Sequence, residues 1–213
     1  MPASIGTGIG IEGIGSLPHG EQVFWLSAIG SYAQEINVAE SQLTKLPEST
    51  LSNEEILPLL CQGMTAHYLV DSAYSVQAGE WTLVTAAAGG VGLLLTQLLK
   101  VRGAKVIALS STPERAQIAL EHGADVVGTY DQMASLTTRA TDGLGVNAVF
   151  DSVGKDYFDN CLETLAPAGM YLLYGGASGP VPPFDLMRLN AKSLAIRRPT
   201  LATYTSTANQ RLA

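Results

Sequence analysis

The sequence is poor in cysteine. Only Cys61 and Cys161 occur among 213 residues, and they lie far apart in the chain. Two distant thiols exclude a disulfide framework and a Cys-rich zinc site, both of which need several closely spaced cysteines. Free cysteines are typical of a reducing compartment, so we expect a cytoplasmic protein.

Basic charge and long apolar runs are also scarce. Twelve Lys and Arg residues stand against nineteen Asp and Glu residues, which gives a formal net charge of −7. Nucleic acids and anionic membrane surfaces require clustered basic side chains, so we expect neither as a partner. No run approaches the roughly 18 apolar residues that span a bilayer. With 46% hydrophobic residues, the chain can nevertheless build an ordinary folded core.

From about residue 80 the sequence alternates strand-like and helix-like segments. The predicted strands cover 80–87, 105–111, 124–130, 146–153 and 170–176, and the predicted helices cover 89–103, 112–123, 131–143 and 155–169. The strands are almost continuously apolar, which is typical of a parallel sheet buried on both faces. We therefore predict a doubly wound α/β domain, the Rossmann fold.

The first part of the chain has a different pattern. Residues 1–48 are rich in glycine, and their short apolar stretches alternate with turn residues, which indicates short strands. Ser52 is suited to cap a helix whose first turn carries Glu54 and Glu55. Pro58 predicts a break in that helix, because proline lacks the N–H that an interior position needs.

Two glycine-rich stretches resemble nucleotide-binding turns. A literal G-x-G-x-x-G runs from Gly8 to Gly13, but no strand precedes it and no helix follows. The motif indicates a dinucleotide site only between a strand and a helix, so we interpret these glycines as bends in a small barrel.

The stretch VTAAAGGVGLLL, residues 84–95, lacks the first glycine of the motif but lies between a predicted strand and a predicted helix. Gly89 would let the backbone approach a pyrophosphate, and Gly92 would let the helix pack closely on the strand. The first helical N–H groups would then face the phosphates. A tight strand–helix turn without a ligand is the alternative interpretation.

The end of the second strand distinguishes the two nicotinamide dinucleotides. An NAD site usually has a carboxylate there, which accepts from the ribose 2′-hydroxyl. Here the strand ends in Ser110 and Ser111, followed by Arg115, and these groups suit a 2′-phosphate. The sequence therefore favours NADP(H). Glu114 is a contrary observation unless it serves the helix dipole, and Arg115 could also be a solvated side chain without a ligand.

Several motifs together resemble one family. GMTAHYLV, AAAGGVG, VFDSVG and YGGASGPVPPFDL occur in this order, and the similarity runs from about Pro2 to Tyr204. The chain resembles the zinc-free, zeta-crystallin-like NADPH:quinone oxidoreductases of the medium-chain dehydrogenase/reductase superfamily. The resemblance implies a partial GroES-like β-barrel domain over 1–57, a Rossmann NADPH-binding domain over 58–198, and a return towards the barrel over 199–213. Family members are longer, which implies truncation at both ends.

The resemblance also implies an activity and a set of cofactor-binding residues. The activity is NADPH-dependent hydride transfer to a quinone or another small electrophilic acceptor. The alternatives are an enone or enoyl-thioester reductase, and a truncated NADPH-binding protein without turnover. No catalytic side chain is assigned. The implied cofactor-binding residues are Thr65, Ala88, Gly89, Gly90, Val91, Ser111, Arg115, Tyr130, Gly175 and Gly176.

We predict no metal site. Cys61 falls where zinc-dependent relatives place one ligand, but catalytic zinc needs three protein ligands, and the three histidines show no ligand spacing. We therefore interpret Cys61 as a small buried apolar residue. A quinone does not require a Lewis acid, because its reduced oxygen has a pKa of roughly 10, like that of tyrosine.

The segment 192–204 begins with a β-rich run and should form a sixth strand at one edge of the sheet. Exposed edges tend to recruit another strand. The family resemblance implies a homodimer joined through this edge of the Rossmann sheet. Alternatively, Arg197 and Arg198 are charges that keep the edge single.

Overall fold

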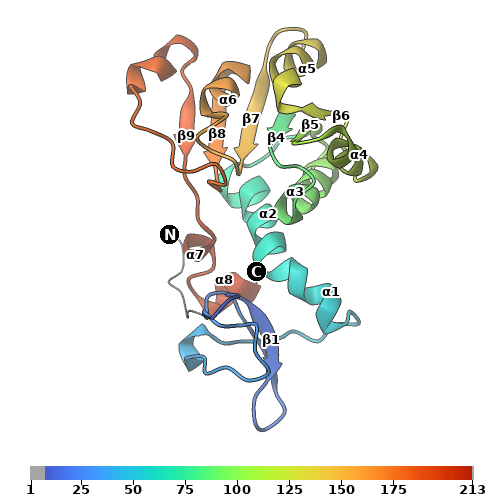
Figure 1. Cartoon of the computed structure of the whole chain (residues 1–213), viewed down its shortest axis with the longest axis vertical. Helices are drawn as coiled ribbons and strands as arrows, with labels where there is room; N and C mark the ends of the chain where they lie inside the picture. Colours follow the sequence, from blue (N-terminus) through green and yellow to red (C-terminus); the bar gives the residue numbers. More distant parts are fainter. Residues whose placement is uncertain (1–7, 213) are drawn as a thin grey trace. The chain divides into compact units, whose positions relative to one another are not determined.

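The computed structural model describes residues 8–212, and the chain divides into two compact units (Figure 1). One unit contains the chain up to Met64 together with the residues from Tyr204 onward. The other runs from Thr65 to Thr203. Among residues 8–212, no helix has the length and apolar character needed to cross a membrane.

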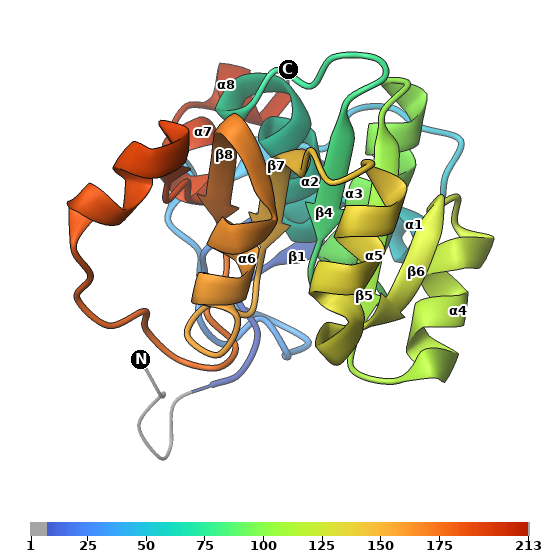
Figure 2. The same ribbon diagram turned by 90° about the horizontal axis from the view of Figure 1, so that it is seen from above.

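The larger unit is built on six parallel strands in the order β6-β5-β4-β7-β8-β9. This is the strand order of a doubly wound dinucleotide-binding fold, with the direction of winding reversed between β4 and β7. The predicted Rossmann fold is confirmed. Figure 2 shows the neighbouring strands β4, β7 and β8. The strands are β4 (Trp81–Val84), β5 (Lys105–Ser110), β6 (Val126–Thr129), β7 (Val146–Asp151), β8 (Leu165–Leu173) and β9 (Ala195–Arg197).

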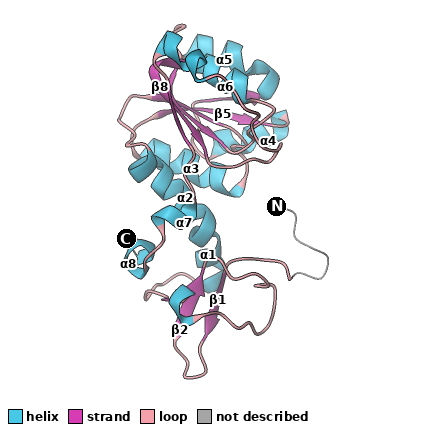
Figure 3. Ribbon diagram, turned by 90° about the vertical axis from the view of Figure 1, so that its left-hand side faces the viewer, coloured by secondary structure: helices cyan, strands magenta, loops and turns pink. Residues whose placement is uncertain are grey.

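Helices connect these strands and bury both faces of the sheet. Figure 3 shows α5 and α6 on one face and α3 on the other. Leu83, Ile107 and Val149, from three different strands, are completely buried, as expected for a covered parallel sheet. The elements are α3 (Gly90–Val101), α4 (Pro113–Glu121), η4 (Tyr130–Gln132), α5 (Met133–Ala140), α6 (Phe158–Thr164) and η5 (Leu186–Lys192).

One predicted helix is too long. The helix expected over 155–169 ends at Thr164, and β8 begins at the next residue. Leu165 is buried and pairs with Val146, so tertiary packing recruits it into the sheet. Pro167 cannot donate a helical hydrogen bond, and Ala168 has a left-handed φ of 61°, which ends helical geometry there.

The sixth strand occupies only part of the segment in which we expected it. It spans Ala195–Arg197 and pairs with β8 at the edge of the sheet. The preceding Lys192 belongs to η5, and Leu201–Tyr204 forms the short helix α7. Pro199 separates strand from helix, because a residue without an N–H cannot continue the ladder.

The smaller unit contains a three-stranded antiparallel sheet of β1 (Gly13–Ser16), β2 (Gln22–Trp25) and β3 (Thr44–Lys45). Antiparallel strands are what the expected GroES-like barrel would contain, and within residues 8–212 this unit has these three. A Cβ on Gly13 would lie 2.4 Å from the indole of Trp25. The literal glycine motif leads into strand β1 and not into a helix. The unit also contains η1 (Glu40–Gln42) and α8 (Ala208–Leu212).

The predicted helix start and break are both present. Ser52 accepts from the Glu55 N–H at 3.3 Å, and the Glu55 carboxylate accepts from the Ser52 N–H at 2.8 Å, which is a capping box. Pro58 is the last residue of α1 (Asn53–Pro58). Beyond it the helical chain alternates between π and α geometry, in η2 (Leu59–Gly63), α2 (Met64–Tyr68) and η3 (Leu69–Ala73).

Candidate functional site

The turn after β4 has an unusual backbone. Ala86 has a left-handed φ of 48°, which costs an alanine about 1–2 kcal/mol. Its N–H donates to the Tyr130 hydroxyl at 3.0 Å, and the Ala87 N–H donates to the Leu109 carbonyl at 2.9 Å. Residues of neighbouring strands and connections therefore hold the turn in a conformation that its own sequence does not favour.

The two glycines of the turn have different roles. A Cβ on Gly92 would lie 2.4 Å from the Ala86 carbonyl oxygen, so only glycine lets α3 begin this close to the turn. A Cβ on Gly89 would meet only that same oxygen, at 3.1 Å, and would otherwise point into open space. Gly92 is thus required by packing, as predicted, whereas Gly89 leaves room for a ligand.

The N-terminus of α3 opens onto that space. Gly89 is its N-cap and offers no capping side chain. Leu93 donates to the Gly89 carbonyl at 2.9 Å, so the N–H groups of Gly90, Val91 and Gly92 belong to the unpaired first turn. These donors and the helix dipole together favour an anion.

Two of the predicted residues are in direct contact. The Arg115 guanidinium donates to the Ala88 carbonyl at 3.3 Å and remains exposed. Ser111 is also exposed and lies between the end of β5 and Thr112, the N-cap of α4. A hydrogen bond from Thr112 lowers the pKa of Glu114, so that carboxylate serves the start of α4. The presence of Glu114 near the end of β5, which seemed to contradict NADP(H), is therefore explained by its role at the start of α4.

The Tyr130 side chain supports the turn after β4. Its ring stacks on that of Tyr157, with centroids 4.1 Å apart and an interplanar angle of 16°. Burial raises the pKa of Tyr130, and its hydroxyl accepts from Ala86. Tyr130 thus shapes the candidate site by holding Ala86.

The loops after β7 and β8 pack tightly against each other. A Cβ on Gly175 would lie 2.5 Å from the Ser152 carbonyl oxygen, so this glycine is required by packing. Gly176 is exposed and has only the Gly179 oxygen near its Cβ position, at 3.7 Å. Thr65 is buried in α2, and within residues 8–212 no hydrogen bond joins it to the other predicted residues.

The sequence analysis did not identify one buried carboxylate. Asp151, at the end of β7, has no exposed surface and accepts hydrogen bonds from the hydroxyls of Thr85 and Tyr171, both at 2.6 Å. Burial and the nearby Asp151 raise the pKa of Tyr171. The signal was present in VFDSVG, because an acidic residue that ends a wholly apolar strand has to be buried with donors.

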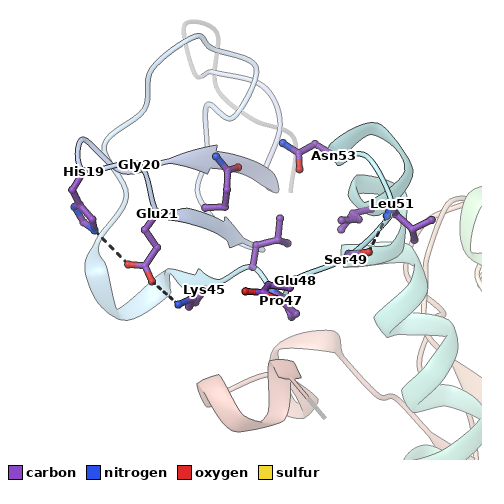
Figure 4. A pocket seen from close by; sticks show the side chains of 12 residues that line it. His19, Gly20, Glu21, Lys45, Pro47, Glu48, Ser49, Leu51 and Asn53 are labelled. Atoms are coloured by element: carbon purple, nitrogen blue, oxygen red, sulfur yellow. Dashed lines mark hydrogen bonds and ion pairs between the residues drawn. The ribbon is translucent and has the colours of Figure 1, made fainter.

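A hollow of about 740 Å³ lies elsewhere, in the smaller unit (Figure 4). Its rim carries the exposed contacts His19–Glu21 and Lys45–Glu21, each at 3.4 Å. None of the predicted cofactor-binding residues lines it, so we do not assign the candidate site to this hollow.

No three His, Cys, Asp or Glu side chains within residues 8–212 are grouped so as to hold a metal ion. Cys61 is half-buried rather than buried, which corrects our expectation. Cys61 lies in η2, where Leu60 is the buried residue.

These features fit a bound dinucleotide phosphate. The first turn of α3 supplies unpaired N–H donors, and a Cβ at Gly89 would intrude on the adjoining space. Arg115 contributes a guanidinium at the rim of the turn, next to an acid-free strand end. All these groups come from the carboxyl ends of parallel strands, where open α/β sheets bind their ligands.

Comparison with known proteins agrees with this geometry. The profile of the zinc-binding dehydrogenase family matches residues 90–212. A probable quinone oxidoreductase of Schizosaccharomyces pombe is 38% identical over 87% of this chain and 56% of its own length. A 2-haloacrylate reductase of a Burkholderia species is 36% identical over 85% of this chain and 56% of its length.

A solved structure is similar over the whole chain. The Escherichia coli quinone oxidoreductase, crystallised as a complex with NADPH, superimposes with a TM-score of 0.90 at 33% identity. The match covers 100% of this chain and 69% of that one, whereas the chain spans slightly more than half the length of the curated relatives above. With a matching family profile, a doubly wound sheet and a glycine turn suited to phosphate, the chain belongs to the zinc-binding dehydrogenase family within the medium-chain dehydrogenase/reductase superfamily, among the quinone oxidoreductases.

Proposed function

We propose that this chain binds NADPH and forms the cofactor-binding part of a reductase that transfers a hydride to a quinone. The observation that carries the proposal is the turn after β4, with its open α3 N-terminus and the Arg115 guanidinium beside an acid-free strand end. The names of the similar proteins support it, because they are quinone oxidoreductases and one was solved with NADPH.

Each group has a binding role in this proposal. The N–H groups of Gly90 and Val91 bind the pyrophosphate, and Gly89 leaves the space that it occupies. Arg115 and Ser111 bind the 2′-phosphate. Ala88 lines the same turn, Tyr130 holds the turn and lies beside the adenosine ribose, and Gly175, Gly176 and Thr65 lie towards the nicotinamide.

When bound, the reduced nicotinamide supplies the hydride. The protein's own residues bind, orient and exclude water. The reduced quinone oxygen resembles a phenolate, with a pKa of roughly 10, so it forms without the Lewis acid that a simple alkoxide would need. For this reason we name no general acid and no metal ligand.

A second acceptor class is supported by one comparison. The similar 2-haloacrylate reductase is named for a substrate that contains an activated carbon–carbon double bond. Hydride addition to such a bond makes the same demands on cofactor positioning. An enone or enoyl-thioester reductase is therefore the alternative activity, and NADPH binding without turnover is a third outcome.

Steady-state NADPH oxidation by the purified chain, with para-benzoquinone, cyclohexenone or no acceptor, distinguishes the three functions. We expect oxidation with the quinone at rates well above both other reactions. Faster oxidation with cyclohexenone would mean that the acceptor is an enone rather than a quinone. Calorimetric NADPH binding without oxidation would support a binding protein, and absence of binding would refute the proposal. The Gly89→Val variant shows whether a measured rate belongs to this turn.

We further propose the domain division 1–57, 58–198 and 199–213, with the first and last parts belonging to the GroES-like domain. The antiparallel sheet β1–β3 supports this division. Within residues 8–212 neither Cys61 nor Cys161 forms a disulfide, which supports the cytoplasm as the location.

We also propose a homodimer joined through the edge strand β9. Beside this edge, the first residues of η5 expose apolar side chains, with Leu186 at 70% and Met187 at 68% of their surface. Light scattering at micromolar concentration should give twice the 22.3 kDa mass of one chain. Changing Leu186 and Met187 to Glu should shift the protein to the monomer, because charges would then be buried at the two-fold axis.

The matched control is Leu144→Glu, which alters an apolar side chain that is 73% exposed and lies outside the β9 edge. This variant should keep the dimer mass. A monomer mass for the unmodified chain at every concentration would refute the dimer and favour Arg197 and Arg198 as charges that keep the edge single.

A further inference from the structure

The Asp151 carboxylate joins three neighbouring strands. Thr85 follows β4, Asp151 ends β7 and Tyr171 lies in β8, and all three side chains are completely buried. Among residues 8–212, no basic side chain forms an ion pair with this carboxylate. Hydrogen bonds therefore have to compensate its burial, because an unpaired buried charge is strongly destabilising.

Four donors do so, two on each oxygen. Oδ1 accepts from the Thr85 hydroxyl at 2.6 Å and the Val153 N–H at 2.8 Å. Oδ2 accepts from the Tyr171 hydroxyl at 2.6 Å and the Gly154 N–H at 3.0 Å. Since each oxygen faces a backbone N–H that cannot accept, an asparagine would confront one N–H with its own amide in either orientation.

The network reaches both loops of the candidate site. Thr85 directly precedes the left-handed Ala86, and its Oγ1 also accepts from the Ser152 N–H at 3.0 Å. The backbone of Asp151 accepts from the N–H groups of Tyr174 at 2.9 Å and Gly175 at 3.3 Å. One residue thus connects the turn after β4 with the loops after β7 and β8.

We propose that Asp151 is a positioning residue that holds the phosphate turn and the loop of Gly175 and Gly176 in register through Thr85, Ser152 and Gly154. That the ligand of these loops is NADPH rests on the proposed function. The coupling of the two loops by Asp151 does not depend on which ligand they bind. A buried acceptor with fixed donors suits this role, because a misplaced partner would leave a buried polar group unpaired.

Thr85→Val tests the proposal against a matched variant, Thr141→Val. The Thr141 hydroxyl is likewise buried, donates to the Thr137 carbonyl at 2.8 Å and accepts from the Gly145 N–H at 2.9 Å. Thr141 is the C-cap of α5 and precedes β7, whereas Thr85 follows the end of β4. Both variants replace a hydroxyl by an isosteric methyl group and lose one donated and one accepted hydrogen bond, although Thr85 donates to a carboxylate and Thr141 to a backbone carbonyl.

Hydrogen–deuterium exchange without ligand is the first measurement. In Thr85→Val, the hydrogen-bonded amides of Ala86, Ala87 and Gly89, of 152–154, and of 174, 175 and 177–179 should exchange about tenfold faster, whereas in Thr141→Val the acceleration should be confined to the region around 141–145. Asp151→Asn should show the Thr85→Val pattern more strongly. Acceleration of only one loop, or the same pattern in both threonine variants, would overturn the proposal.

NADPH titration is the second measurement. Thr85→Val should raise the dissociation constant about tenfold, and Thr141→Val should leave it unchanged. Equal increases of the dissociation constant in the two variants would mean that Asp151 stabilises the fold without positioning the site. If the unmodified chain does not bind NADPH, the proposed function fails, but the exchange pattern still decides whether Asp151 couples the loops.

Discussion

Replacing Gly89 by valine is expected to abolish binding of both NADPH and NADH. The Cβ position of Gly89 points into open space beside the first turn of α3, apart from the Ala86 oxygen at 3.1 Å. Branched methyl groups there would occupy the pyrophosphate position and separate the phosphate from its N–H donors. Because charge-assisted hydrogen bonds contribute about 1.5–3 kcal/mol each, losing two weakens binding by about a hundredfold or more.

Calorimetric titration with each cofactor measures this effect, and circular dichroism verifies the fold. The domain should remain folded, because Gly89 has an extended φ of −87° that valine also adopts. A poorer N-cap costs about 1 kcal/mol, which lowers Tm by about 2–4 °C. Gly89→Ala, with the smaller side chain, should lose less affinity. Undiminished binding by a folded valine variant would show that the turn is only a strand–helix junction.

Replacing Arg115 by alanine should weaken NADPH binding about tenfold or more and leave NADH binding nearly unchanged. The guanidinium is exposed and uses one of its five N–H donors on the Ala88 carbonyl, so the others are available to a 2′-phosphate. A charge-assisted phosphate contact contributes about 1.5–3 kcal/mol. Dissociation constants of both cofactors, measured at one fixed salt concentration, give the ratio.

The matched control for Arg115→Ala is Arg102→Ala. Arg102 caps the opposite end of α3 and pairs with Asp71 at 2.7 Å, so its removal changes the net charge equally without touching the turn. We expect unchanged affinity for both cofactors. Equal losses of NADPH and NADH in Arg115→Ala would mean that this arginine supports the turn through Ala88 rather than reading the phosphate.

Much of the larger unit could be predicted because its signals are local. Apolar strands alternating with capped helices define a doubly wound domain, and Pro113, Gly103 and Gly123 mark helix ends through backbone preferences that do not depend on tertiary context. The glycine turn after β4 could be located for the same reason. Gly89 is adjacent to the N-terminus of α3 and Gly92 lies in its first turn, so the features of the turn are close in sequence as well as in space.

Predictions were wrong where distant residues compete with local preference. The sequence by itself determined the alternation of strands and helices, the position of the glycine turn and the acid-free end of β5. Tertiary structure decided that Leu165 leaves its helix to pair with Val146. It also decided that Thr85 and Tyr171, from two other parts of the sheet, donate to the buried Asp151 carboxylate. The physical reason is that a buried charge and a strand register depend on partners many residues away, which no local pattern specifies.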